Sequence, residues 1–140
     1  MAEKQTFTNV VIIEDNPALA QMLKEILTHT ANCRSEVFNR GKLGVEYLEK
    51  LSAETPANLP DLVILDLGLP DGSGLGFLKQ IKTHKKLAEI PVIVNTGSEN
   101  LEDFAEAKQW DKVIFLKKGM GKFALGEIIA KLKSEGTIRS

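Results

Sequence analysis

Five short apolar runs, each followed by polar residues, recur along the chain. Residues 10–13, 62–65, 91–94 and 113–116 are continuously apolar, and residues 33–38 form a weaker run. Apolar runs of four to eight residues are typical of strands buried on both faces, as in a parallel sheet that helices cover. The pattern therefore predicts five strands.

The segments between these runs carry apolar residues at the spacing of amphipathic helices. Asn16, Ser73 and Ser98 stand where a helix cap is expected, and Pro17 suits a first helical turn. We expect the second helix over residues 41–53 and the third to end near Lys86. The buried faces predicted for the five helices are, in chain order, Leu19, Met22, Leu23, Ile26 and Leu27; Gly44, Tyr47, Leu48 and Leu51; Leu75, Leu78, Ile81 and Lys82; Leu101, Phe104 and Ala105; and Leu125, Ile128, Ile129 and Leu132.

Strands that alternate with helices imply right-handed crossovers and therefore a parallel sheet. We predict an α/β fold, a flavodoxin-like doubly wound sheet of five strands in the order 2-1-3-4-5 with five helices. That order puts the first and third strands side by side, about 4.8 Å apart. We expect one domain over residues 1–140, with a core over about 8–133, a loop over 54–60 and a polar tail from Ser134.

Composition narrows the functional classes. The net charge of −1 gives no electrostatic reason to expect nucleic acid or membrane as a partner. The single Cys33 cannot form an internal disulfide, and no signal-peptide pattern or membrane-length apolar run is present, so we expect a soluble cytoplasmic protein. The single Trp110 is expected to fill the core near the end of the fourth helix.

Polar residues of chemical interest stand at the predicted strand ends. Glu14 and Asp15 follow the first strand, Asp66 ends the third, and Thr96 and Lys117 end the fourth and fifth. Taken singly, each has an ordinary explanation, such as a capping turn, an Asx turn or a solvated loop. Together they place three carboxylates, a hydroxyl and an ammonium at one edge of the sheet. Clustered carboxylates favour Mg²⁺, and the two donors suit phosphoryl transfer.

Four segments resemble the receiver domains of response regulators in two-component signalling. They are residues 11–16 (VIIEDN), 65–74 (LDLGLPDGSG), 91–97 (PVIVNTG) and 115–117 (FLK), and the resemblance extends over about residues 8–132. Because no output domain is recognisable in the sequence, we expect a stand-alone regulator or a phosphorelay shuttle.

This resemblance implies a set of site residues. Asp66 would accept a phosphoryl group from a sensor histidine kinase or a phosphotransfer protein. Asp15, Asp66 and the main-chain carbonyl of Gly68 would ligate Mg²⁺, and Glu14 would act through a water molecule. The implied cofactor is therefore Mg²⁺, held at the end of the third strand.

Two further residues and a docking face follow from the same resemblance. Thr96 would bond a phosphoryl oxygen, and Lys117 would pair with that group. Such a protein is a switch that catalyses its own phosphorylation and dephosphorylation and is not a dedicated enzyme. It would dock an unidentified protein target through the fourth helix, fifth strand and fifth helix, with a phosphorylation-dependent homodimer as an alternative.

Three positions depart from the family pattern. Ile114 stands where receivers often carry an aromatic switch residue, and Lys118 stands where many have a proline. Asn95 interrupts an apolar strand, so its side chain must find partners at the strand end or across the loops. Ile114 and Lys118 leave open an alternative, a receiver-like adaptor that works without phosphate.

Two rival classes fit the residues poorly. A haloacid-dehalogenase-like phosphatase would need a second Asp two residues after Asp66, and that residue is Gly68. A flavin-binding electron carrier would need a phosphate-binding loop after the first strand, where the acidic pair Glu14 and Asp15 would repel phosphate.

Overall fold

The computed structural model describes residues 8–97, 101–117 and 122–138, and of residues 30, 31, 96, 101–104, 122 and 123 it describes the backbone alone. Within these residues, no helix is both long and apolar enough to cross a bilayer. The elements are β1 (Thr8–Ile13), α1 (Pro17–Ala31), β2 (Cys33–Phe38), α2 (Gly41–Glu54), the 3₁₀ helix η1 (Pro56–Asn58), β3 (Leu62–Asp66), β4 (Gly68–Leu69), β5 (Gly72–Ser73), α3 (Gly74–Thr83), β6 (Val92–Thr96), α4 (Leu101–Lys108), β7 (Val113–Lys117) and α5 (Lys122–Ser134).

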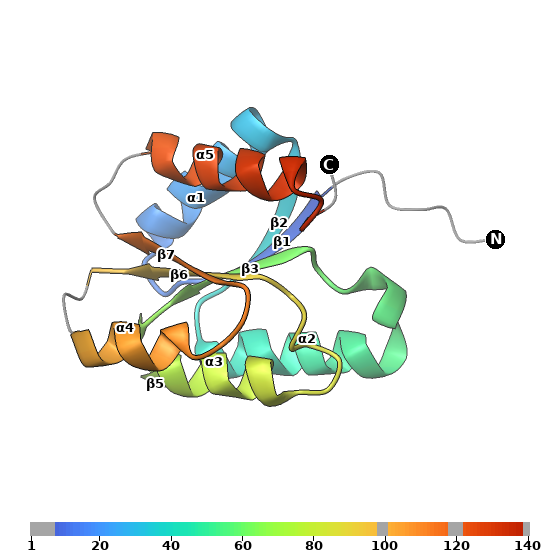
Figure 1. Ribbon diagram of the computed structural model, residues 1–140, viewed down its shortest axis with the longest axis vertical. Coiled ribbons are helices and arrows are strands. Elements are labelled where there is room, and N and C mark those ends of the chain that lie inside the picture. Colours follow the sequence, from blue (N-terminus) through green and yellow to red (C-terminus); the bar gives the residue numbers. More distant parts are fainter. Residues whose placement is uncertain (1–7, 98–100, 118–121, 139–140) are drawn as a thin grey trace.

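The longer strands of the described chain form one parallel sheet in the order β2-β1-β3-β6-β7. Strands β6 and β7 are the fourth and fifth of that sheet, because β4 and β5 pair separately as a small antiparallel hairpin. Helices α1 and α5 cover one face of the sheet, and α2, α3 and α4 cover the other (Figure 1). The predicted flavodoxin-like α/β fold and its strand order are confirmed.

Alternate residues of the central strands face two separate apolar clusters. Val11 and Val63 lie in the cluster that α2 and α3 cover, whereas Ile12 and Ile64 lie in the cluster that α1 and α5 cover. All four side chains are at most 3% exposed. Burial on both faces leaves no position for a polar side chain, which explains the continuous apolar runs.

The predicted caps of the first and third helices are confirmed. Asn16 accepts hydrogen bonds through its side-chain oxygen from the backbone N–H groups of Ala18 (3.0 Å) and Leu19 (3.2 Å). The Ser73 hydroxyl accepts one from the N–H of Leu75 at 3.2 Å. These bonds satisfy N–H groups that have no partner within the helix. The third predicted cap, Ser98, lies outside the described residues.

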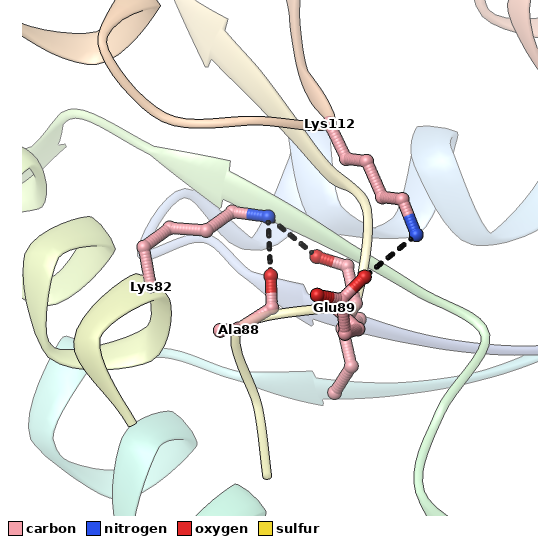
Figure 2. Close-up of polar contacts among 5 residues, drawn as sticks. Lys82, Ala88, Glu89 and Lys112 are labelled. Atoms are coloured by element: carbon pink, nitrogen blue, oxygen red, sulfur yellow. Dashed lines mark hydrogen bonds and ion pairs between the residues drawn. The ribbon is translucent and has the colours of Figure 1, made fainter. Parts of the chain in front are cut away.

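The third helix is shorter than predicted, because it ends at Thr83 and not near Lys86. After Thr83 the chain turns and brings Leu87 fully into the core. Lys82, which the sequence placed on the helical stripe without a partner, is buried, and its ammonium donates hydrogen bonds to the backbone carbonyls of Ala88 (3.2 Å) and Ile90 (2.8 Å) (Figure 2). This contact ties the end of α3 to the turn before β6.

Three expectations about buried faces are wrong at single positions. Met22 is 45% exposed, because it lies one residue, or about 100° of helix rotation, before the buried Leu23. On α4, Ala105 is exposed and Ala107 is buried instead. The tail beyond Ser134 is not merely polar, because Ile138 packs into the cluster between α1 and α5.

Trp110 behaves as predicted. It follows α4, is partly buried, and packs against the cluster that α2 and α3 cover. It precedes the first residue of β7, so it lies at the amino edge of the sheet. A fluorescence signal from this ring therefore cannot report directly on a site at the carboxyl edge.

Candidate functional site

Three carboxylates converge at the carboxyl edge of the central strands. The parallel pairing of β1 and β3 ends with Ile13 beside Leu65, so Glu14, Asp15 and Asp66 come directly after this pair. One oxygen from each of the three carboxylates lies within 4.8 Å of the other two. Glu14 and Asp66 are 2% and 3% exposed, whereas Asp15 is exposed. Two carboxylates of the cluster are therefore buried, and the third is exposed to solvent.

Local hydrogen bonds fix the turn that carries the first two acids. The backbone N–H of Glu14 donates to the carbonyl of Phe38 at the end of β2, at 2.9 Å. The Glu14 carboxylate accepts from the backbone N–H of Asn16 at 3.2 Å. Because Asn16 also caps α1, the acidic turn is tied both to a neighbouring strand and to the helix that follows it.

The loop after Asp66 folds back tightly on the end of β3. The Asp66 carboxylate accepts a hydrogen bond from the Gly68 backbone N–H at 3.1 Å, and the Gly74 N–H donates to the carbonyl of Leu67 at 3.0 Å. A Cβ atom at position 74 would collide with the Leu67 backbone, so this close approach requires glycine. The loop therefore holds Gly68 beside the acceptor carboxylate.

This donor set fits a hard divalent cation. Carboxylate oxygens are preferred ligands of Mg²⁺, which forms bonds of about 2.0–2.1 Å and keeps several water molecules. Oxygens spread over 4.8 Å can share one such ion, partly through water. Because Asp15 is exposed, an ion held there would be accessible from solvent.

The other two predicted site residues lie on neighbouring strands at the same edge. Thr96 and Lys117 are register partners and end β6 and β7. Since β6 pairs with β3, Thr96 is one strand away from Asp66 and Lys117 is two strands away. The Lys117 side chain is exposed, and the side chain of Thr96 lies outside what the structure describes. The backbone therefore brings all the predicted residues to one edge.

Asn95 lies nearer to the site than the sequence established. Strand β6 continues through Asn95, which is the register partner of Asp66 on one side and of Leu116 on the other. Its side chain is 3% exposed. Of the two explanations open from the sequence, a solvent-exposed place at the end of the strand does not fit this burial.

One residue of interest at this edge was missed from the sequence. Asp71 follows Asp66 by five positions, and its carboxylate accepts hydrogen bonds from the backbone N–H groups of Gly41 and Lys42, both at 2.9 Å. The turn sequence of Pro70, Asp71 and Gly72 predicts a loop. It gives no sign that the loop caps a distant helix, because that contact depends on the tertiary fold.

Comparison with known proteins gives a family. A model for the response regulator receiver domain matches residues 10–132. The KDP operon transcriptional regulatory protein KdpE of Escherichia coli is 32% identical over 126 residues, which cover 90% of this chain and 50% of KdpE. The response regulator Rcp1 of Synechocystis is 26% identical over 126 residues, which cover 89% of this chain and 86% of Rcp1. The chain therefore spans half the length of one relative and most of the other.

Solved structures agree with this result. The phosphorylated cyanobacterial phytochrome response regulator RcpA has a TM-score of 0.76 and 25% identity, with 91% of this chain and 92% of that chain covered. The Mn²⁺-bound form of Rcp1, at 24% identity, shares the fold with a TM-score of 0.74 over 91% of this chain and 92% of that chain. Since the matched residues include nearly every element of the sheet, the chain belongs to the response regulator receiver domain family of two-component signalling.

Proposed function

We propose that the chain is a phosphorylation-activated signalling switch in which Asp66 accepts the phosphoryl group. The observation that carries this proposal is the convergence of Glu14, Asp15 and Asp66, with ligand oxygens within 4.8 Å, at the end of the central strand. Like charges at this distance repel one another, and a divalent cation relieves that repulsion. Membership of the receiver family supports a histidine kinase or a phosphotransfer protein as the phosphodonor.

The proposed direct ligands of Mg²⁺ are Asp15, Asp66 and the main-chain carbonyl of Gly68, and Glu14 acts through a water molecule. The bound ion supplies positive charge against the phosphoryl oxygens. The Asp66 carboxylate lies in the buried part of the cluster, and the hydrogen bond from the Gly68 N–H holds one of its oxygens. The other oxygen of Asp66 is then the proposed nucleophile.

In the transfer, that Asp66 oxygen forms a bond to phosphorus while the bond between phosphorus and the donor's imidazole nitrogen breaks. The electron pair of the broken bond stays on the nitrogen. The Thr96 hydroxyl donates a hydrogen bond to a phosphoryl oxygen, and the Lys117 ammonium pairs with the same group. Their backbone positions, one and two strands from Asp66, support these roles. Positioning and charge stabilisation do most of the work in such transfers.

The phosphorylated state is proposed to be read on α4, β7 and α5. Thr96 ends β6, and the chain continues from there towards α4, on which Glu106 is exposed. Ile114 is half-buried against the cluster that α1 and α5 cover, and Phe115 packs against the opposite cluster. In this proposal an aliphatic repacking of β7 or a loop shift replaces the rotation of an aromatic ring at position 114.

Intact-mass measurement after incubation with acetyl phosphate and Mg²⁺ tests the proposal. The wild type is expected to gain one phosphoryl group, and Asp66→Asn to gain none. Asp61→Asn is a matched control, because Asp61 precedes the amino end of the same strand and accepts a hydrogen bond from the Asn9 N–H at 2.9 Å. A phosphoryl group that persists in Asp66→Asn refutes the assignment. A folded wild type that takes up none favours the phosphate-independent adaptor.

A further inference from the structure

Asp71 lies at the tip of the β4–β5 hairpin and contacts a helix 30 residues earlier in the sequence. Its two carboxylate oxygens accept hydrogen bonds from the backbone N–H groups of Gly41 and Lys42, each at 2.9 Å. We infer that Asp71 is a positioning residue for the Mg²⁺ site, because it ties the loop that carries Gly68 to the first turn of α2. This inference rests on the proposed function.

The hairpin is very small, and its anchors to the rest of the fold include the buried side chain of Leu69 and the contacts of Asp71. Strands β4 and β5 have two residues each, and an isolated two-stranded hairpin is marginal even at greater length. The bonds from Gly68 to Asp66 and from Gly74 to Leu67 join the hairpin only to its own base. The bonds of Asp71 instead join its tip to a separate element, which restricts how the Gly68 carbonyl can move relative to Asp66.

The first turn of α2 is suited to hold a carboxylate. Its N-cap residue, Arg40, makes no side-chain capping bond, so Asp71 supplies the cap from outside the helix. A negative charge at a helix N-terminus is favoured by the helix dipole. The N–H groups of Lys42 and Gly41, together with the charge of Arg40, hold the pKa of Asp71 below its usual value. Asp71 therefore keeps its charge at neutral pH.

Packing beneath this contact sets the distance between the hairpin and the helix. The buried ring of Phe77, on α3, occupies the space that a Cβ atom at Gly41 would fill. A Cβ atom at Gly72 would lie 3.4 Å from the same ring, and the φ of +153° at Gly72 also favours glycine. Phe77 thus separates the two segments from below, and Asp71 joins them at the surface.

A pair of variants separates positioning from simple helix capping. Asp71→Ala removes both functions. Arg40→Ser combined with Asp71→Ala gives α2 a cap from its own N-cap residue, because the side chain of a serine at that position accepts a hydrogen bond from the N–H of the second or third helical residue. Arg40→Ser alone is the control. For each protein, urea unfolding without Mg²⁺ gives the free energy of unfolding. An NMR titration of the Gly68 amide gives the Mg²⁺ dissociation constant, and the hydrogen-exchange rate of that amide shows how readily the loop opens.

We expect Asp71→Ala to lose stability, to exchange the Gly68 amide faster without metal, and to bind Mg²⁺ about tenfold more weakly, the lower end of the loss for outer-shell partners of metal ligands. In the double variant, stability should recover while exchange and affinity do not. Recovery of all three measurements in the double variant would reduce Asp71 to a cap and overturn the inference.

The inference and the proposed function fail in different ways. Wild-type Mg²⁺ affinity in Asp71→Ala, combined with lost affinity in Asp66→Asn, overturns the positioning inference alone. A wild type that binds no Mg²⁺ overturns the proposed function and the inference with it. Arg40→Ser alone is expected to match the wild type in affinity and in exchange of the Gly68 amide.

Discussion

The buried Lys82 makes the stability of the fold depend on pH in a direction that can be measured. Its side chain is 7% exposed and donates hydrogen bonds to two backbone carbonyls (Figure 2). The pKa of Lys82 is lowered from 10.5 to about 8, chiefly by burial and also by the charge of Lys112, while Glu89 and Asp111 act in the opposite direction. Lys112 is itself paired with Glu89 at 3.0 Å.

The sign follows from proton binding in the two states. Between pH 8 and 10.5 the unfolded chain holds a proton on Lys82 that the folded protein has released, so the free energy of unfolding rises with pH across this window. The stabilisation is complete above 10.5 and is lost as the pH falls through about 8. At 1.36 kcal/mol for each pH unit, the full effect is about 3 kcal/mol as an upper bound. The neutral amine still donates hydrogen bonds to the carbonyls.

Urea unfolding of the wild type and Lys82→Met between about pH 7 and pH 10 measures this effect. Methionine keeps an unbranched apolar stem and removes the titrating group, so the difference between the two proteins isolates Lys82. Burial also raises the pKa values of Cys33 and Tyr47, but their contribution is common to both proteins and cancels. Between pH 7 and 10 the wild type should gain stability relative to the variant by up to about 2.5 kcal/mol, most of the full effect.

Lys79→Met is the matched control, because Lys79 is exposed and lies one turn earlier on the same helix. The free energy of unfolding of Lys79→Met should change with pH as that of the wild type does. Parallel profiles for the wild type and Lys82→Met would show that burial does not perturb Lys82, and would refute the reasoning.

Two further predictions concern the carboxyl edge. Mg²⁺ affinity, measured by NMR titration, should fall further in Asp15→Asn than in Glu14→Gln, while either change should raise stability without metal by relieving repulsion around Asp66; equal affinities in the wild type and Asp15→Asn contradict the ligand assignment. Hydrogen exchange with beryllofluoride and Mg²⁺ should change in α4, β7 and α5, and changes confined to the loops around Asp15 and Asp66 would promote the adaptor.

The fold was predictable because its signals are local or topological. A strand buried on both faces must be apolar throughout, so the runs at 10–13 and 62–65 identify strands without tertiary information. Once the strands are parallel, their carboxyl ends share an edge, and Glu14, Asp15 and Asp66 must converge there. The position of the carboxylate cluster therefore follows from parallel pairing together with the strand order, which puts the first and third strands side by side.

The features that were missed depend on contacts between distant segments. A lysine beside the apolar face of a helix usually indicates a solvent-exposed side chain. Nothing in the sequence shows that two backbone carbonyls of the following turn accept hydrogen bonds from the ammonium of Lys82. Asp71 reads as a turn residue because turn chemistry explains it fully. Its role at α2 depends on the distance between two loops, which Phe77 sets.

The two edges of the sheet satisfy buried charge in opposite ways. At the amino edge, the ammonium of Lys82 donates hydrogen bonds to two backbone carbonyls, which offset part of the cost of its burial. At the carboxyl edge, Glu14 and Asp66 are almost completely buried, and Asp15 brings a third charge of the same sign within 4.8 Å. Compensation there calls for positive charge from outside the cluster, which a divalent cation would supply. Asp71 joins the loop at this edge to α2, so the role proposed for it would link the stability of that loop to the binding of the cation through one side chain.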